Sequence, residues 1–199
     1  MHLLVATNNA HKVKEIRGIL AEFSLPLLTP AELGGLPELP ETGATFADNA
    51  AEKALAAAKF AQGRGRTEVW AFADDSGLEV AALGGAPGVY SARYAPTDPE
   101  RIARLLAAME GNPDRRARFV CVIALADPDR LLASFRGEVR GTIADAPHGA
   151  SGFGYDPVFI PDGHDRTFAE LGPAVKDRIS HRARALQAFR EYLASAPQG

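Results

Sequence analysis

Two long segments joined by a short polar turn constrain the fold most strongly. Residues 118–126 are almost entirely apolar, residues 131–143 carry apolar residues between polar ones, and the turn between them contains Asp127-Pro128-Asp129. This pattern is typical of a β-hairpin with long strands. The chain is therefore predicted to contain a β-sheet in which this hairpin is a major part.

Further strands and helices are expected on both sides of the hairpin in the sequence. Residues 2–6 and 68–73 are predicted strands, the acidic run 74–77 is predicted to end the second one, and 78–82 is a further candidate strand. Predicted helices begin after Asn9, Thr45 and Thr97, since asparagine and threonine both favour the N-cap. The first has apolar positions from Val13 to Phe23, the second runs to about Ala61, and a last helix carries Ile179, Leu186, Phe189 and Leu193. Because strands and helices do not alternate strictly, the predicted class is α/β with a mixed sheet flanked by helices.

The bulk composition suits one globular domain, alone or with a lobe. The chain has 199 residues, is 46% hydrophobic and 24% charged, and carries a net charge of −3. Nothing in that balance suggests a broad nucleic-acid surface. The N-terminal apolar run is too short for a signal peptide or a membrane span. We therefore expect a cytoplasmic protein that binds neither nucleic acid nor membranes.

The single cysteine, Cys121, lies within the apolar run 119–123. It cannot form an internal disulfide, and a reactive thiol needs a nearby cation and solvent access. Since the run offers neither, Cys121 is predicted to be a buried strand thiol in a reducing compartment.

The segment from Thr7 to Lys12 joins a predicted strand to a predicted helix. A helix start presents backbone N–H groups and the positive end of the helix dipole, which suit phosphate. Thr7, Asn8 and Asn9 add polar side chains, and Lys12 adds a positive charge. Taken alone, an ordinary capped helix with a solvated lysine explains the segment better, because such junctions are common.

The acidic run Asp74-Asp75-Ser76-Gly77 is a candidate metal site. Two adjacent carboxylates at the end of a strand resist burial unless a cation or hydrogen-bond donors satisfy them. Mg²⁺ usually takes one or two carboxylates together with phosphate oxygens and water. A plain acidic turn competes with this interpretation, since Asp, Ser and Gly all favour turns.

Glu41 is an extra carboxylate close to the helix that Thr45 opens. On that helix Asn49, Lys53 and Ala56 share a face by their spacing, so Lys53 would point with Asn49 toward a ligand. The alternative is that Lys53 is a solvated lysine.

Residues 151–157 place two aromatic side chains between glycines. Phe153 and Tyr155 either stack on a nucleotide base or close over the core as a plug, and the two readings are about equally supported. Lys176 and Ser180 are four residues apart and are expected on one face at the start of the last helix. The chain has no zinc-type spacing of His or Cys, no Walker loop and no dinucleotide fingerprint.

The order of these motifs is more specific than any one of them. It reads Thr-Asn-Asn-x-x-Lys from Thr7, Glu-Thr-Gly from Glu41, Asn-x-x-x-Lys-Ala from Asn49, Ala-Asp-Asp-Ser-Gly-Leu from Ala73, Leu-Gly-Gly-x-Pro-Gly-Val-Tyr-Ser-Ala-Arg from Leu83, Gly-Phe-Gly-Tyr-Asp-Pro from Gly152, and Ser-His-Arg from Ser180. From Leu3 to about Leu193 the chain thus resembles the Ham1 family of inosine/xanthosine triphosphate pyrophosphatases. Asn8 stands where many members have Gly, and Tyr155 where some have Trp.

The resemblance implies an elongated α/β fold with a central mixed sheet and a cleft between two lobes, so that residues 1–199 form one two-lobed domain. It also implies a homodimer and a requirement for Mg²⁺. By the same resemblance the segment 84–93 would be a dimer contact, and the alternative is a structural turn. The reaction would convert a purine nucleoside triphosphate, preferably ITP, dITP or XTP, into its monophosphate and pyrophosphate. Its role would be to remove deaminated purines from the nucleotide pool.

Residue by residue, the resemblance implies three groups. Thr7, Asn8, Asn9, Ala10, His11 and Lys12 would bind the triphosphate, with Lys53 assisting. Asp75 would be the catalytic acidic residue and a metal ligand, Glu41 the second metal ligand, and Ser76 a substrate contact. Phe153, Gly154, Tyr155, Asp156, Lys176, His181 and Arg182 would form the nucleoside pocket.

The base preference has a hydrogen-bond explanation. Hypoxanthine and xanthine carry a 6-oxo acceptor and an N1–H donor, whereas adenine reverses both. Arg182 or His181 suits the 6-oxo group and Asp156 suits N1–H, so adenine would leave buried groups unpaired. Two other functions stay open at this stage. One is a nucleotide sensor without catalysis, and the other is a Maf-like pyrophosphatase acting on other nucleotides.

Overall fold

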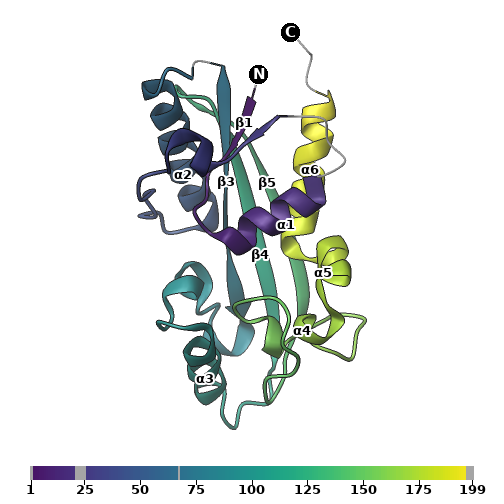
Figure 1. The fold of residues 1–199 in the computed structure, drawn as a ribbon. Coiled ribbons are helices and arrows are strands. Elements are labelled where there is room, and N and C mark those ends of the chain that lie inside the picture. Colours follow the sequence, from purple (N-terminus) through teal and green to yellow (C-terminus); the bar gives the residue numbers. More distant parts are fainter. Residues whose placement is uncertain (1, 21–25, 67, 196–199) are drawn as a thin grey trace. The chain divides into compact units, whose positions relative to one another are not determined.

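The computed structural model describes residues 2–20, 26–66 and 68–195 (Figure 1). Its strands are β1 (His2–Val5), β2 (Leu27–Leu28), β3 (Val69–Val80), β4 (Arg116–Ala126), β5 (Leu131–Ile143) and β6 (Phe159–Pro161). They form one sheet in the order β2-β1-β3-β4-β5-β6. β1 pairs in parallel with β2 and β3, and β6 pairs antiparallel with β5. The predicted α/β class with a mixed sheet and the β4–β5 hairpin are therefore confirmed.

The helices are α1 (Ala10–Leu20), α2 (Phe46–Gly63), α3 (Asp98–Ala108), α4 (Phe168–Leu171), α5 (Pro173–Ile179) and α6 (His181–Ser195). The predicted N-caps are confirmed at α2 and α3. Thr45 accepts from the backbone N–H of Asp48, and Thr97 forms a full capping box with Glu100. Among the described residues, no helix is long and apolar enough to cross a membrane.

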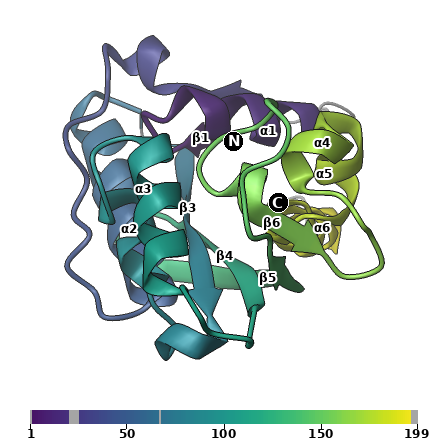
Figure 2. The same ribbon diagram turned by 90° about the horizontal axis from the view of Figure 1, so that it is seen from below.

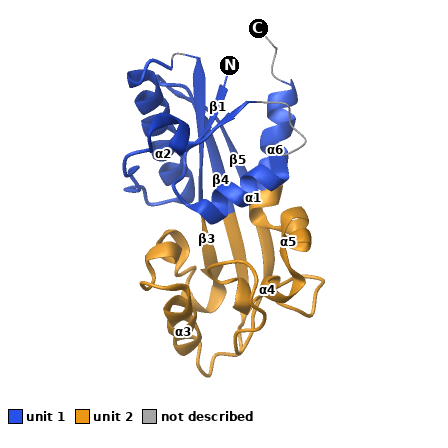
Figure 3. Ribbon diagram, in the orientation of Figure 1, with its two compact units in different colours: residues 1–75, 121–136, 185–199 blue, residues 76–120, 137–184 orange. Residues whose placement is uncertain are grey.

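The chain divides into two compact units, coloured separately in Figure 3. Unit 1 comprises residues 1–75, 121–136 and 185–199, and unit 2 comprises 76–120 and 137–184. Strands β3, β4 and β5 each contribute residues to both units. In β3 the boundary falls between Asp75 and Ser76, in the middle of the acidic run.

In unit 1, helices α1 and α6 pack on one face of the sheet and α2 lies on the other (Figure 2). Because side chains alternate along a strand, Phe72 of β3 and Cys121 of β4 face the α1–α6 layer. The α2 face is lined with small residues, and Ala50, Ala54, Ala57, Ala58 and Ala61 of that helix are fully buried. Alanine lets α2 approach the sheet closely, which brings its longer polar side chains near β3.

Unit 2 has its own core around the C-terminal half of β3 and the N-terminal half of β4. Leu105 of α3 and Met109, its C-cap, pack there with Leu78 of β3. Three rings, those of Phe119, Phe159 and Phe168, contact one another in the same core. This core supports the loop that carries Phe153 and Tyr155.

Three predictions about the elements are wrong. The run 74–77 does not end a strand, because β3 continues through it to Val80. The candidate strand 78–82 is therefore not a separate strand, and residues Ala81–Leu83 form a 3-10 helix. The aspartates lie inside the strand because cationic and amide side chains satisfy them there. The predicted last helix is also two helices, since Ser180 has extended backbone and separates α5 from α6. Phe23, predicted at the end of the first helix, lies outside the described residues.

Candidate active site

Two consecutive aspartates of β3 are buried, and each is paired with a lysine from a different helix. Asp74 is 3% exposed and Asp75 is 7% exposed. Oδ2 of Asp74 lies 3.0 Å from Nζ of Lys12 in α1, and Oδ1 of Asp75 lies 3.0 Å from Nζ of Lys53 in α2. The two aspartates pair with different helices because neighbouring side chains of a strand point to opposite faces of the sheet. Helices α1 and α2 cover these opposite faces.

Asp75 belongs to a cluster of polar contacts on the α2 side of β3. Lys53 Nζ also lies 2.9 Å from Oε1 of Glu41, so one ammonium joins two carboxylates. The second oxygen of Asp75 accepts from Nδ2 of Asn49 at 3.1 Å. Asn49 and Lys53 are one helical turn apart, which places both beside the same carboxylate.

Burial and charge act on this cluster in opposite directions. Burial raises the pKa of the Asp75 carboxyl above its ordinary value, and the nearby cations Lys53 and Lys12 offset this only in part. Burial lowers the pKa of Lys53, but the carboxylates of Asp75, Asp74 and Glu41 outweigh it, so that pKa lies above its ordinary value. Lys53 is therefore held in its charged form among acidic neighbours.

The segment 41–43 is fastened to α2 by its backbone. Thr42 donates through its N–H and hydroxyl to the carboxylate of Glu52, at 2.9 Å each, and the Gly43 N–H donates to Oδ1 of Asn49 at 2.9 Å. A Cβ at Gly43 would collide with Cβ of Asp48, so only glycine fits without a shift. These contacts set the position from which Glu41 reaches Lys53.

The start of α1 is capped by Asn9, as predicted. Its Oδ1 accepts from the N–H groups of His11 and Lys12, at 3.0 and 3.2 Å. Asn8, Asn9, Ala10 and His11 are exposed, and Thr7 is half-buried. No non-glycine residue in the described part of the chain has a positive φ, so asparagine is accommodated at position 8.

A second group of predicted site residues lies in unit 2. Nζ of Lys176 lies 2.6 Å from Oδ2 of Asp156, and both side chains are almost completely buried. The same oxygen accepts from the Phe153 N–H at 2.9 Å. The ammonium of Lys176 also lies 4.4 Å from the centre of the Phe153 ring, within range of a cation–π interaction.

His181 and Arg182 occupy the first turn of α6. The His181 ring stacks on Phe119, with centroids 4.7 Å apart and planes at 11°. Arg182 is 1% exposed, and its Nη2 donates to Oγ of Ser76 at 3.0 Å. Its guanidinium carbon lies 5.8 Å from the centre of the Phe153 ring. The structure thus joins Ser76, Phe153 and Arg182 in one contact group.

The two aromatic side chains of the 151–157 loop have different positions. Tyr155 is 4% exposed, belongs to the core of unit 2, and donates its hydroxyl to the Ser91 carbonyl at 3.0 Å. Burial raises the pKa of that phenol. Phe153 is only half-buried and contacts two cations. The neighbouring Gly154 N–H donates to Asp98 of α3 at 2.7 Å, which fastens the loop. Tyr155 is therefore the plug, and Phe153 is the more accessible of the two aromatic residues.

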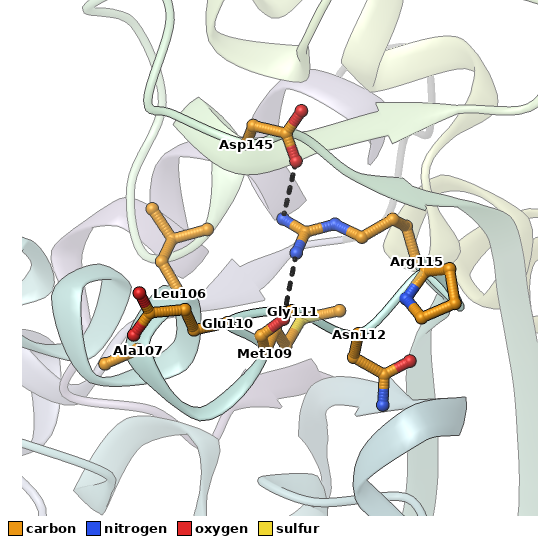
Figure 4. Close-up of a pocket in the computed structure, with 9 residues that line it drawn as sticks. Leu106, Ala107, Met109, Glu110, Gly111, Asn112, Arg115 and Asp145 are labelled. Carbon is orange, nitrogen blue, oxygen red and sulfur yellow. Dashed lines mark hydrogen bonds and ion pairs between the residues drawn. The ribbon is translucent and has the colours of Figure 1, made fainter.

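One surface pocket of unit 2 lies apart from these groups (Figure 4). It has a volume of about 570 Å³ and is lined by α3 and the turn after it together with Arg115 and Asp145. The Arg115 guanidinium already donates to the carbonyls of Ile143 and Ala144. None of the predicted site residues lines this pocket.

The chain matches the Ham1 family model over residues 3–192. The chain belongs to the Ham1 family. A dITP/XTP pyrophosphatase of Gloeobacter violaceus is 52% identical over 186 residues, covering 93% of this chain and 90% of the relative. A dITP/XTP pyrophosphatase of Deinococcus radiodurans is 50% identical, covering 94% and 90%.

Solved structures agree with the family assignment. A HAM1 protein from Coxiella burnetii has a TM-score of 0.87 at 42% identity and covers 98% of this chain and 100% of its own. A nucleoside-triphosphatase / dITP/XTP pyrophosphatase from Mycobacterium abscessus has a TM-score of 0.73 at 42% identity, covering 95% and 98%. The resemblance inferred from the motifs is confirmed.

The sequence predicted that Asn49 points with Lys53 toward a ligand, but it did not predict the two contacts that Asn49 makes. The structure brings it to Asp75 and Gly43, and the signal was its i, i+4 spacing to Lys53. Glu52 was not singled out at all, because a carboxylate that accepts from a loop backbone has no sequence pattern of its own.

Proposed function

We propose that this chain hydrolyses deaminated purine nucleoside triphosphates, namely ITP, dITP and XTP, to the monophosphate and pyrophosphate. The observation that carries the proposal is the pairing of Glu41 and Asp75 through one ammonium, that of Lys53. Such an arrangement is costly to bury and suits chemistry on a polyanion with a bound cation. Membership of the Ham1 family and the names of the relatives support the choice of substrate.

We propose Mg²⁺ as the cofactor, held by Glu41 and Asp75. The carboxylates of Glu41 and Asp75 already surround one cation, the ammonium of Lys53. Because their oxygens are arranged around a positive charge, they are also suited to bind a metal cation. Within the described residues, His, Cys, Asp and Glu form no cluster of three or more suited to a metal. Two carboxylates suffice for Mg²⁺, which completes its shell with phosphate oxygens and water. When bound, it would supply neutralisation of phosphate charge and polarisation of the phosphate oxygens.

The remaining chemistry belongs to side chains of the protein. Asp75 would orient a water molecule toward the α-phosphorus and accept its proton, with Asp74 in support through its pairing with Lys12. Lys12, Lys53 and the polar side chains at the start of α1 would bind the triphosphate. Since Asn9 caps two N–H groups of α1, phosphate binding there depends mainly on side chains.

The nucleoside would be bound by residues of unit 2. Phe153 offers its ring to the base, with Lys176 fixing that ring by the cation–π contact. Arg182 and His181 suit the 6-oxo group of hypoxanthine or xanthine. Oδ2 of Asp156 already accepts from Lys176 and from the Phe153 backbone. We propose that the same carboxylate also accepts from N1–H of the base.

We also propose a homodimer in the cytoplasm. Support comes from the family and from Tyr90, which is 63% exposed in the segment Gly88–Arg93. An exposed aromatic side chain of this size suits a protein contact. Light scattering coupled to size exclusion would give the mass of two chains, and a mass of one chain would refute the dimer.

The function is tested by pyrophosphate release from ITP, dITP, XTP, dTTP, UTP and the standard purine triphosphates, with and without Mg²⁺. The expected result is Mg²⁺-dependent release that is fastest with ITP, dITP or XTP. Release mainly from dTTP or UTP would instead favour a Maf-like activity. Binding of ITP without any release would favour a sensor.

A further inference from the structure

Asn49 joins two segments of the chain that are far apart in sequence. Its side chain is fully buried, and it uses both ends of its amide. Oδ1 accepts from the Gly43 N–H at 2.9 Å, and Nδ2 donates to Oδ2 of Asp75 at 3.1 Å. One amide therefore contacts both the loop that carries Glu41 and the strand that carries Asp75.

The orientation of that amide follows from its neighbours. A backbone N–H can only donate, and an ionised carboxylate can only accept. Oδ1 of Asn49 must therefore face Gly43, and Nδ2 must face Asp75. A residue that only accepts or only donates cannot make both contacts, and an aliphatic residue can make neither.

The Asp75 carboxylate is held at both oxygens from the same helix. Lys53 holds Oδ1 at 3.0 Å and Asn49 holds Oδ2 at 3.1 Å. Rotation of the carboxylate would leave a buried polar group without its hydrogen bond, which is unfavourable. The plane of the carboxylate is thus fixed by two donors of α2. Lys53 is the charged donor and Asn49 is the neutral one.

The loop on the other side of Asn49 is equally constrained. Gly43 leaves no room for a Cβ against Asp48, and Thr42 is fastened to Glu52. With both residues held, the backbone next to Glu41 has a defined position relative to α2. The contact from Asn49 to Gly43 is the one that ties this position to Asp75.

We propose that Asn49 is a positioning residue. It fixes the Asp75 carboxylate and the segment 41–43 relative to each other, so that Glu41 and Asp75 present their oxygens to one cation. The inference rests on the proposed function, in which these two carboxylates hold the metal. Asn49 itself touches neither substrate nor metal in this account.

Two substitutions separate the two contacts of Asn49. Asn49→Asp keeps an acceptor for Gly43 but removes the donor to Asp75 and places a like charge beside it. Asn49→Leu is similar in size and removes both contacts. Ala57→Gly is the matched control, because Ala57 is a fully buried residue of the same helix, and glycine there weakens the helix without touching the cluster.

Hydrogen exchange at the Gly43 amide reports on the loop independently of activity. Protection should persist in Asn49→Asp and in Ala57→Gly, and fall in Asn49→Leu. Binding of Mn²⁺ without nucleotide, followed by its paramagnetic resonance signal, should weaken about tenfold in Asn49→Leu. Unchanged Gly43 exchange in Asn49→Leu together with wild-type Mn²⁺ binding would overturn the proposal.

Turnover supplies the second readout. With dITP, both Asn49 variants should lose kcat by about 10²-fold, as expected for misplaced reacting groups, while KM for dITP changes little. Ala57→Gly should keep the wild-type kcat at a temperature where it is folded. Wild-type kcat in Asn49→Asp, or an equal loss in Ala57→Gly, would refute a positioning role. If the wild type itself released no pyrophosphate from dITP, the proposed function would fail. The hydrogen-exchange and Mn²⁺-binding results would still test whether Asn49 positions Asp75 and the segment 41–43.

Discussion

The ammonium of Lys53 lies 3.0 Å from Oδ1 of Asp75, within a buried part of unit 1. A buried ion pair rarely stabilises a fold by much, because desolvation offsets the attraction. Its retention beside a second carboxylate, that of Glu41, is therefore better explained by function. Lys53 lies between these two acids, and we propose that it would bind phosphate once a metal neutralised them.

Lys53→Met should separate metal binding from turnover. Without the ammonium, Glu41 and Asp75 repel each other and have no competing cation, so Mn²⁺ should bind more tightly than to wild type in the absence of nucleotide. Turnover of dITP should nevertheless fall by about 10²-fold, because a charge that stabilises the transition state is lost. Titration with Mn²⁺ and steady-state kinetics on the same preparation check both effects. Weaker Mn²⁺ binding in this variant would show that Lys53 does not occupy the metal position.

Asp74→Asn should act mainly on stability. The substitution removes the charge that pairs with Lys12, whose side chain is 16% exposed, but keeps an oxygen that can accept from it. We expect a loss of about 1–3 kcal/mol in the free energy of unfolding, in line with a weakened buried contact, measured by urea denaturation. Its kcat should fall much less than that of Asp75→Asn. The reverse order of the two kcat values would make Asp74 the catalytic base.

Gly43→Ala should impair the site without touching any proposed metal ligand. The added Cβ collides with Cβ of Asp48 and lies 3.0 Å from the backbone nitrogen of Asn49, so the segment must shift. Since that shift moves Glu41, the Mg²⁺ concentration for half-maximal activity should rise about tenfold or more, as expected for a displaced ligand. Gly63→Ala, at the C-terminal end of α2 and with open space around it, is the control. An unchanged Mg²⁺ requirement in Gly43→Ala would show that the loop position is not important.

Arg182→Ala should reduce the preference for ITP over ATP. Arg182 is proposed to donate to the 6-oxo group, since its guanidinium lies beside Phe153, the ring proposed to contact the base. The ratio of kcat/KM for ITP to that for ATP should fall by about tenfold or more, as expected when a specific buried hydrogen bond is lost. The ratio is measured because removal of so buried a side chain also lowers stability. A loss of folded enzyme would reduce both kcat/KM values but not their ratio. An unchanged ratio would assign base selection to other residues.

Tyr155→Phe should leave catalysis intact. The hydroxyl donates to the Ser91 carbonyl inside the core of unit 2, so its loss should destabilise the fold by about 1 kcal/mol. Phe153→Ala should instead raise KM for dITP, because Phe153 is the ring proposed to contact the base. Calorimetric melting and steady-state kinetics separate the two. A large KM increase in Tyr155→Phe would place Tyr155 in the nucleoside pocket.

Much of the fold was predictable because it depends on local patterns. The N-caps Asn9, Thr45 and Thr97 gave the starts of three helices, and the β4–β5 hairpin was visible in its apolar runs. The acidic run 74–77 was not predictable as strand, because its turn-forming residues are stabilised there by partners distant in sequence. Lys12 and Lys53 reach Asp74 and Asp75 only after the helices have packed on opposite faces of the sheet.

In the candidate site, too, some features could be predicted from the sequence and others depend on tertiary packing. Glu41, Lys53 and Asp75 could be named from spacing and family motifs, and the structure brings all three together. The different positions of Phe153 and Tyr155 could not be read from the sequence, since both are aromatic residues flanked by glycine. Only the packing of Tyr155 into the core of unit 2 separates them. Asn49 was visible on the right helix face, but its two contacts depend on the path of the segment 41–43.

We propose that Asp75 promotes cleavage between the α- and β-phosphorus of dITP. Phosphorus NMR of dITP incubated with Mg²⁺ and either wild type or Asp75→Asn measures this cleavage. Wild type should form dIMP and pyrophosphate as its only products, and a normally folded Asp75→Asn should lose most turnover. Formation of dIDP and phosphate by wild type, or pyrophosphate release by Asp75→Asn near the wild-type rate, would contradict it.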